Sequence, residues 1–185
     1  MIFEETKLKG AFIIRPERHE DERGFFARTF CLKEFAENGI QMMVAQSSVS
    51  FNKTKGTFRG MHFQAPPYSE AKIISCTQGS LINYIVDLRI GSATYGKWTS
   101  VELTAENRMQ LYVPEMFANG LITLVPDTQV QYHMSQFYKA DAARGFQWND
   151  PAFDIQLPFS VNAISEKDRS WPPFQFPEIF QLQRK

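Results

Sequence analysis

The sequence predicts an all-β protein with a few short helices. Its 185 residues include 17 Phe, 10 Gly and 10 Pro. Aromatic residues suit the pleated surface of a sheet, and Gly and Pro favour turns. Apolar runs recur at roughly ten-residue spacing, separated by Gly, Pro or Asn, and no internal repeat or low-complexity segment interrupts them. This pattern is typical of a β-sandwich or a β-barrel.

The first part of the chain is predicted to contain strands and one helix. Residues 17–23 are charged and indicate a loop, and Gly24 then begins a strand that carries Phe25, Phe26 and Phe30. The segment from Leu32 to Asn38 has one apolar face and is followed by Gly39, which favours a helix ending there. Residues 52–56 are predicted to form a hairpin turn. The strands expected here cover Leu8–Arg15 and Met42–Phe51.

The rest of the chain follows the same strand-and-turn pattern. The expected strands cover Ile73–Thr77, Ser80–Leu88, Trp98–Leu103, Arg108–Val113, Gly120–Val125 and Gln129–Met134. The C-terminal third is rich in Trp and Pro and is expected to lie as extended cover over one face. No composition shift marks a boundary, so we expect a single domain over 1–185 with a C-terminal tail from about residue 169 to 185.

Composition and charge exclude several classes of function. Lys and Arg total 20, as do Asp and Glu, so the net charge is zero and a nucleic-acid surface is not expected. No apolar run approaches the roughly 20 residues of a membrane helix, and no export signal follows Met1. Cys31 and Cys76 are too few for a disulfide framework and are expected to be reduced. We therefore predict a cytoplasmic protein that binds neither nucleic acid nor membrane.

The segment Gly56–Cys76 concentrates residues that could carry chemistry. It contains Arg59, His62, Glu70 and Lys72, and His62 lies in an apolar run typical of a half-buried strand. A histidine with two cations on adjoining strands would suit an anionic ligand. This stretch alone is equally compatible with a buried, hydrogen-bonded histidine beside two surface cations.

Other motifs narrow the chemistry further. The sequence has no dinucleotide-binding or phosphate-loop glycine pattern, no nucleophile elbow, and no histidine or cysteine spacing for a metal site. His19 lies in the charged loop and is interpreted as solvated. His133 follows Tyr132 in a strand, so the two face opposite sides. The remaining set of His, Lys, Arg, Tyr and Asp suits proton abstraction better than covalent or metal catalysis.

Several motifs together resemble the dTDP-4-dehydrorhamnose 3,5-epimerase family. In order along about Leu8 to Asp168 they read DERGFF, QSSVSFN, KGTFRGMHFQ, SEAKIISCTQGS, VDLR, TYGKW, RGFQWNDP and ISEKD. RGMHFQ with the downstream EAK is the most specific part. The resemblance implies a cupin-type jelly roll, that is, a double-stranded β-helix. It also implies a homodimer, no cofactor, and a nucleoside-diphospho-4-keto-6-deoxysugar as substrate.

The resemblance also assigns catalytic roles to individual residues. It implies that His62 is the base and that Asp168 pairs with it to fix its tautomer. Lys72 would stabilise an enolate at the C4 oxygen, and Tyr132 would return the proton from the opposite face. Taken alone, Tyr132 is typical of a core tyrosine and Asp168 of a loop or capping residue.

Substrate-binding residues follow from the same motifs. Arg23 and Arg59 match residues that hold the diphosphate, although Arg23 alone could belong to a solvated face. Strict alternation would put Arg59 and His62 on opposite faces of one strand, and a bulge at Gly60 could realign them. The remaining matches are Phe26 on the nucleotide side, Gln46 on the sugar side and Tyr138, which would stack on the base of the nucleotide.

The sequence departs from the family on the sugar side. Where the family usually has His in FAHGF, this chain has Asn119, which cannot hold a proton near neutral pH. Ser48 stands where many members carry Asn. We predict inversion at C3 and C5 of a nucleotide 4-keto-6-deoxyhexose. These changes leave two alternatives open, which are inversion at C3 only and movement of the carbonyl between C4 and C3. A non-catalytic nucleotide-sugar-binding jelly roll is the alternative outside enzymes.

Overall fold

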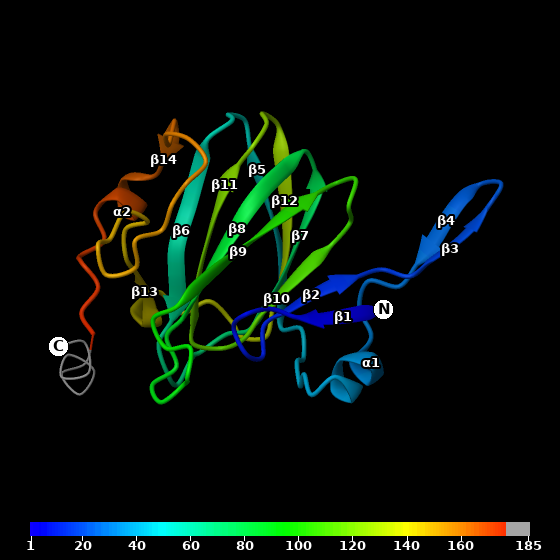
Figure 1. Ribbon diagram of the computed structural model, residues 1–185, viewed down its shortest axis with the longest axis horizontal. Coiled ribbons are helices and arrows are strands. Elements are labelled where there is room, and N and C mark those ends of the chain that lie inside the picture. The colour runs from blue at the N-terminus through cyan, green and yellow to red at the C-terminus, as the bar shows by residue number, and fades with distance from the viewer. Residues whose placement is uncertain (177–185) are drawn as a thin grey trace.

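The computed structural model describes residues 1–176, and its body consists of two β-sheets that face each other (Figure 1). Residues 177–185 of the predicted tail lie outside the described residues. The first sheet, here called sheet A, contains in spatial order β1 (Ile2–Glu5), β2 (Phe12–Arg15), β10 (Gln110–Val113), β7 (Lys72–Gln78), β12 (Thr128–Met134) and β5 (Gln46–Asn52).

The second sheet, here called sheet C, lies opposite sheet A. Its spatial order is β13 (Ala143–Gly145), β6 (Thr57–Gln64), β11 (Phe117–Thr123), β8 (Ser80–Asp87) and β9 (Trp98–Thr104). β14 (Ala163–Ile164) pairs with β6 as well, in parallel. The helix α2 (Glu166–Arg169) follows β14 directly and contacts β6.

A separate two-stranded hairpin projects from this body (Figure 1). It consists of β3 (Arg18–Asp21) and β4 (Gly24–Ala27). The predicted loop over 17–23 is therefore wrong in part, because these charged residues form a strand. Their charge reflects full exposure on both faces, and not the lack of regular structure. The predicted strand beyond Gly24 ends at Ala27, before Phe30.

From β5 to β12 the strands alternate between the two sheets, except that β8 and β9 form a hairpin within sheet C. β5, β7, β10 and β12 belong to sheet A, whereas β6, β8 and β11 belong to sheet C. The predicted hairpin turn at 52–56 is therefore wrong: β5 pairs with β12, β6 pairs with β11, and the connection crosses from one sheet to the other. This alternation is the double-stranded β-helix expected from the motifs.

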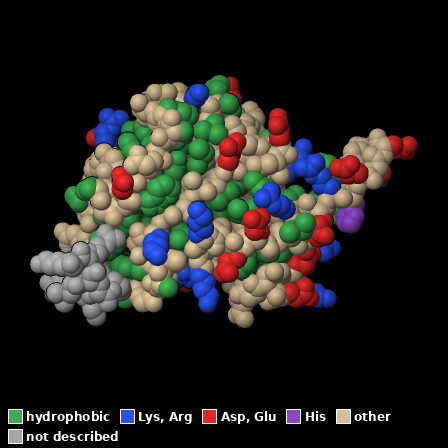
Figure 2. All heavy atoms as spheres, viewed as in Figure 1, with side chains coloured by type: hydrophobic (Ala, Val, Ile, Leu, Met, Phe, Trp, Pro, Cys, Tyr) green, Lys and Arg blue, Asp and Glu red, His purple; other side chains and the backbone are tan. Residues whose placement is uncertain are grey.

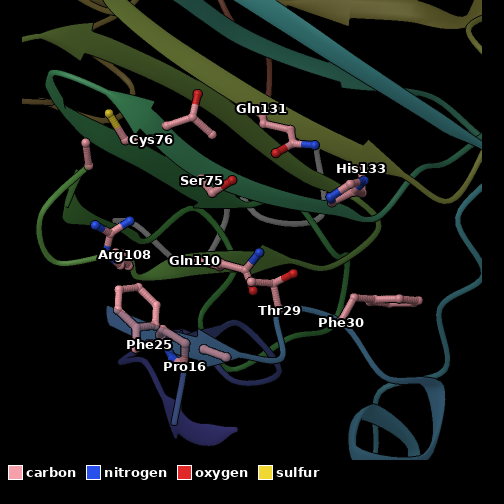
Figure 3. A pocket seen from close by; sticks show the side chains of 13 residues that line it. Pro16, Phe25, Thr29, Phe30, Ser75, Cys76, Arg108, Gln110, Gln131 and His133 are labelled. Atoms are coloured by element: carbon pink, nitrogen blue, oxygen red, sulfur yellow. The ribbon is translucent and has the colours of Figure 1, made fainter. Parts of the chain in front are cut away.

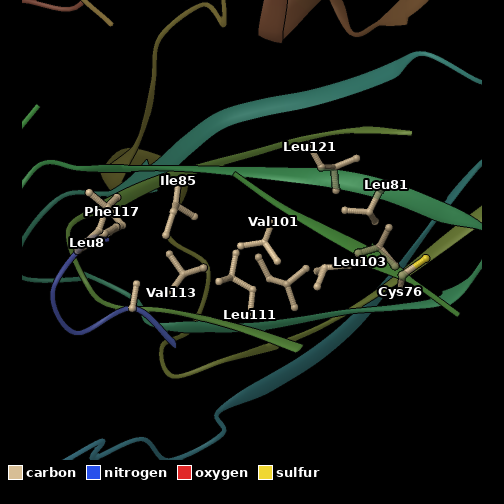
Figure 4. Packing of buried hydrophobic residues seen from close by; sticks show 13 residues of the cluster. Leu8, Cys76, Leu81, Ile85, Val101, Leu103, Leu111, Val113, Phe117 and Leu121 are labelled. Carbon is tan, nitrogen blue, oxygen red and sulfur yellow. The ribbon is translucent and has the colours of Figure 1, made fainter. Parts of the chain in front are cut away.

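The main core fills the space between the sheets, because every second residue of each strand points inward. Its members are almost fully buried and include Leu81 and Ile85 of β8 and Leu111 and Val113 of β10 (Figure 4). A second cluster covers the outer face of sheet C. There, Phe146, Phe153 and Phe174 pack on β6 and β8, as the prediction of C-terminal cover requires.

Helix α1 (Leu32–Glu37) confirms the predicted helical segment. Its Phe35 is fully buried against Tyr112 and Phe3 on sheet A. None of the helices within residues 1–176 has the length and apolar character needed to cross a bilayer. Acidic and basic side chains are mixed on the part of the surface nearest the β3–β4 hairpin (Figure 2), which fits the zero net charge.

Candidate functional site

The site centres on a hydrogen bond between His62 and Asp168. His62 Nε2 lies 2.6 Å from Asp168 Oδ1, although the two residues are 106 positions apart in sequence. Asp168 lies on α2, where the Ser165 hydroxyl accepts from its backbone N–H and caps the helix. The Asp168 side chain is only 6% exposed and that of His62 is 40% exposed. The carboxylate is thus held inside the protein while the imidazole remains open to a ligand.

The protein stabilises Asp168 in its charged form. Burial alone would raise its pKa, but hydrogen bonding and attraction from His62 outweigh that effect, and the Gly60 backbone N–H donates to Asp168 Oδ2 at 3.3 Å. The pKa of Asp168 therefore lies below its ordinary value. A carboxylate in this position accepts a hydrogen bond from the Nε2–H of His62. This leaves Nδ1 as the ring nitrogen that can take up a proton.

Arg59 and His62 are brought to the same side of β6 by a register shift at Gly60. His62 is opposite Asn119 and Arg59 is opposite Leu121, so β6 holds one residue more than β11 between these pairs. Arg59 Nε donates to Asn52 Oδ1 of β5 at 2.7 Å, across to the other sheet. The expected realignment at Gly60 is confirmed.

Glycine is required at position 60 for two reasons. Its φ is +144°, a conformation that side chains rarely adopt, and an added Cβ would lie 2.4 Å from Gly120 Cα. The close approach of the Gly60 and Gly120 backbones thus fixes the bulge that directs Arg59 and His62 to the same side of β6.

Tyr132 and Lys72 approach the same interior from sheet A. Tyr132 shares an inward face with Val130 of β12, and Lys72 shares one with Ile74 of β7. The Tyr132 hydroxyl lies 3.3 Å from Ser50 Oγ, and burial raises its pKa, so the phenol stays protonated near neutral pH. The two residues therefore face the sheet that carries His62.

Lys72 is held by a buried partner. Its Nζ lies 2.9 Å from Glu70 Oε1, and the two side chains are 14% and 11% exposed. Gln64 of β6 donates to the other Glu70 oxygen at 3.4 Å. The ammonium is therefore fixed close to the β6 side of the interior.

A pocket of about 220 Å³ opens beside His62 and Lys72, and Tyr132 is not among the residues that line it. Tyr138 lines it, and the backbone N–H of Tyr138 donates to Gln46 Oε1 at 2.7 Å. The structure thus connects three predicted residues, His62, Lys72 and Tyr138, at one pocket, with Gln46 fixing its rim. The complete lining is His62, Phe63, Gln64, Glu70, Lys72, Tyr138, Ala143, Arg144, Lys167 and Trp171.

Arg23 and Phe26 are not brought to this pocket by their own chain. Both lie on the β3–β4 hairpin, which projects on the side of the molecule opposite β6 and α2 (Figure 1). Phe26 is 73% exposed, and among residues 1–176 the ion-pair partner of Arg23 is Asp21 at its own turn. Within one chain, these two predicted ligands are separated from the rest of the site.

Trp171 is the clearest member of the pocket that the sequence did not indicate. Its ring contacts the His62 imidazole edge-on with centroids 6.2 Å apart, and Lys167 lies over it. A Cβ at position 145 would lie 2.6 Å from the indole, so Gly145 makes room for it. The adjacent WPP sequence indicated only surface cover, because nothing local shows that this segment returns to β6.

A larger pocket, of about 440 Å³, lies on the outer face of sheet A at the foot of the hairpin. Polar side chains of the sheet, Ser75, Gln131 and His133, face Phe25 and Phe30 across it (Figure 3). Burial lowers the pKa of His133. This pocket contains none of the predicted site residues, and the alternation that separates His133 from Tyr132 is confirmed. Within residues 1–176, no His, Cys, Asp and Glu side chains cluster in a metal-binding arrangement.

The fold and the site together define a cupin-type jelly roll that carries a His–Asp pair opposite a tyrosine and a lysine. This chain belongs to the dTDP-4-dehydrorhamnose 3,5-epimerase family, whose model matches residues 5–175. A curated dTDP-4-dehydrorhamnose 3,5-epimerase from Sinorhizobium fredii is 40% identical over 183 residues, which cover 98% of this chain and 94% of the relative.

Solved structures agree with this assignment. The dTDP-4-dehydrorhamnose 3,5-epimerase from Bacillus anthracis, with TDP and PPi bound, superposes with a TM-score of 0.90 at 38% identity and covers 94% of this chain and 99% of its own. A 3'-monoepimerase from Streptomyces bikiniensis in complex with dTDP-quinovose has a TM-score of 0.83 at 28% identity and covers 91% of this chain and 85% of its own.

Proposed function

We propose that this chain is an epimerase that inverts C3 and C5 of a nucleoside-diphospho-4-keto-6-deoxyhexose. The observation that carries the proposal is the arrangement of His62 with Asp168 on one sheet and Tyr132 with Lys72 on the other. Epimerisation requires a base on one face of a sugar ring and an acid on the other. The C4 ketone makes the hydrogens at C3 and C5 acidic, so the reaction requires no cofactor.

Each inversion then proceeds in two proton transfers. His62 Nδ1 takes the proton from the carbon next to the ketone, and the C–H electrons form the enolate. The Asp168 carboxylate stabilises the resulting imidazolium. Lys72 stabilises the enolate oxygen electrostatically. The Tyr132 hydroxyl delivers a proton to the opposite face of the carbon, which restores the ketone with inverted configuration. Its raised pKa supports this role, because it keeps the phenol protonated.

The separation of Arg23 and Phe26 from the pocket supports a homodimer in which the hairpin of one chain reaches the site of the other. An exposed Phe26 on a projecting hairpin gains burial only against another molecule. Arg23 of one protomer and Arg59 of the other would then hold the diphosphate from two sides. The same proposal places the enzyme in the cytoplasm, where the free thiols of Cys31 and Cys76 remain reduced.

Hydrogen exchange tests the reaction directly. Incubation with dTDP-4-keto-6-deoxyglucose in deuterated water should introduce deuterium at both C3 and C5, measured by NMR. His62→Ala should abolish exchange at both carbons, whereas His133→Gln, on the outer face, should exchange at the wild-type rate. No exchange with this substrate or its CDP and GDP analogues would overturn the enzyme proposal, and would leave a nucleotide-sugar-binding protein.

The role of Tyr132 has a separate signature. Tyr132→Phe should still exchange the C3 proton, because His62 can remove and return it on one face. Net inversion should fall by about 100-fold or more, since the opposite face lacks its acid. Equal losses of exchange and inversion would show that Tyr132 is not the proton donor.

Mixed dimers test whether the hairpin acts between chains. His62→Ala has an intact hairpin, and the Arg23→Ala/Phe26→Ala double variant has an intact base, so each alone should show little activity. Co-expressed in equal amounts, they should recover about one quarter of wild-type activity, because half of the dimers then contain one complete site. A mixed dimer without recovered activity would place the hairpin's action within one chain, and would leave the epimerase proposal standing.

Inversion at C3 only is the second candidate. It is favoured by Asn119, which stands beside His62 in the position of a family histidine, and by the structural similarity to a 3'-monoepimerase. Deuterium at C3 without deuterium at C5 would establish it.

A further inference from the structure

Two buried asparagines form a pair on the interior face of sheet C. Asn83 of β8 is 0% exposed and Asn119 of β11 is 7% exposed. Asn119 Nδ2 donates to Asn83 Oδ1 at 2.5 Å and to the Tyr84 carbonyl oxygen at 3.3 Å. The pair lies on the face shared with Leu81, Ile85 and Leu121, which point into the main core.

The Tyr84 carbonyl fixes which way the Asn119 amide points. A carbonyl oxygen can only accept, so Nδ2 must be the atom that faces it. Asn83 Oδ1 then accepts the second Nδ2 proton. Both donors of Asn119 are consumed by these two bonds, and Oδ1 is directed away from them. Within residues 1–176 no donor reaches that Oδ1, and it is not sealed from solvent as the Asn83 amide is.

Asn119 lies beside the proposed base. It is the direct cross-strand partner of His62, and opposite residues of an antiparallel pair share a face. An Oδ1 at this place meets a bound sugar next to the carbon from which His62 removes a proton.

The Asn83 side chain lowers the stability of the fold in a way that an apolar core residue would not. Its Nδ2 is buried and has no hydrogen-bond partner within the described residues. An unpartnered buried donor destabilises a protein, and an aliphatic side chain of similar size would avoid that cost. The role of Asn83 therefore lies in its acceptor atom, Oδ1, which binds the Asn119 amide.

We infer that Asn83 is a positioning residue that makes Asn119 an acceptor only, and that Asn119 thereby selects substrates with a hydroxyl at C2 or C3 of the sugar. The inference rests on the proposed function. An amide locked in this way cannot donate to the C4 ketone or move a proton. It accepts a hydrogen bond from a sugar hydroxyl, and on a 4-keto-6-deoxyhexose the ring hydroxyls left are those at C2 and C3.

Deoxy analogues and matched variants test the inference. Wild type should exchange the 2-deoxy or the 3-deoxy analogue about 10-fold less efficiently than the full substrate in kcat/KM, because the missing donor leaves Oδ1 unpaired. Asn119→Leu should lower kcat/KM on the full substrate by a similar factor and show no discrimination against that analogue. Asn83→Leu should lose the same discrimination although Asn83 does not face the sugar, whereas Asn83→Asp, which keeps the acceptor, should retain it.

Two further measurements would not be affected if Asn119 were purely structural. They are the pH dependence of kcat/KM and the exchange of the Asn119 side-chain protons in the ligand-free protein. Asn119→His should add a titrating limb to kcat/KM that wild type lacks. In ¹⁵N-labelled wild type, the Asn119 side-chain protons, assigned by their loss in Asn119→His, should exchange slowly with solvent because both are bonded.

The outcomes separate the two proposals. Lack of exchange on the full substrate by wild type contradicts the proposed function. Exchange on the full substrate with no discrimination against either analogue, or with discrimination that survives in Asn119→Leu, overturns the inference alone. If the leucine variants do not fold, fast exchange of the Asn119 side-chain protons in wild type overturns it instead.

Discussion

Asp168 and His62 illustrate how single residues acquire function through their partner. The imidazole has a free face toward the pocket, and its other nitrogen is held by a carboxylate that the Gly60 N–H also fixes. Asp168 in turn depends on the short helix α2, which Ser165 caps. The chemistry of His62 is thus set by a segment that follows it by more than a third of the chain.

Removal of the Asp168 charge should affect catalysis far more than folding. In Asp168→Asn the amide cannot stabilise an imidazolium as a carboxylate does, so we expect exchange at C3 and C5 to fall by about 100-fold or more. Glu166→Gln on the same helix, at an exposed position, is the matched control and should leave the rate unchanged. A loss of less than a few-fold in Asp168→Asn, measured by NMR in deuterated water, would show that the Asp168 carboxylate does not support the proposed proton transfer by His62.

At the scale of elements, β6 organises the site. It pairs with β11 along one edge and with β13 and β14 along the other, and it contacts α2. Its outer residues, such as Phe58 and Met61, pack under the C-terminal segment, and Arg59, His62 and Gln64 belong to the interior. The register shift at Gly60 permits this division, because regular alternation would separate Arg59 from His62.

Gly60→Ala should therefore disrupt the protein at this strand. The new Cβ meets the Gly120 backbone, which cannot move aside as a side chain could, and the positive φ adds strain. We expect the free energy of unfolding to fall by about 3 kcal/mol or more, measured by urea denaturation. Gly91→Ala has a φ of +88° but open space around the Cβ, so it should cost only about 1 kcal/mol. Similar losses in both variants would show that contact with Gly120 is unimportant.

At the scale of the whole molecule, the alternation of strands between two sheets places His62 and Tyr132, the proposed base and acid, on facing sheets. β6 and β12 are distant in the chain and belong to different sheets, so the site forms only when the barrel closes. Packing of α1 on the outer face of sheet A buries a further tyrosine. Burial raises the pKa of Tyr112, on sheet A beneath α1, to about 12.

The raised pKa of Tyr112 predicts alkaline sensitivity. A group whose pKa is higher in the folded state contributes stability that is complete below its unfolded value of 10 and is lost as the pH rises toward 12. At pH 11 the loss should be about 1.4 kcal/mol relative to neutral pH. Tyr112→Phe lacks this titration. The unfolding free energy of wild type, relative to that of Tyr112→Phe, should therefore fall by that amount between pH 8 and pH 11, measured by urea denaturation. A constant difference would contradict the prediction.

Much of the fold could be predicted because strand residues obey a local rule. Alternating apolar residues and turn residues locate β8, β9 and β12 almost to their ends, and the apolar face of residues 32–38 locates α1. The short β13 and β14 carry no such signal, because their pairing with β6 forms them. The charged β3 was missed for the related reason that both of its faces are exposed.

The sequence by itself determined that this is an all-β protein of the epimerase family and which of its residues are candidates for its chemistry, because residue type and order along the chain are properties of the sequence. Only the tertiary structure decided which residues meet. It brings Asp168 into a hydrogen bond with His62, and the register shift at Gly60 turns Arg59 to the same side of β6 as His62. It also separates Arg23 and Phe26 from the pocket of their own chain. It also joined Asn119 to Asn83, for which no sequence pattern predicts a role. Contacts of this kind depend on strand register and on the pairing of distant segments, which no local pattern records.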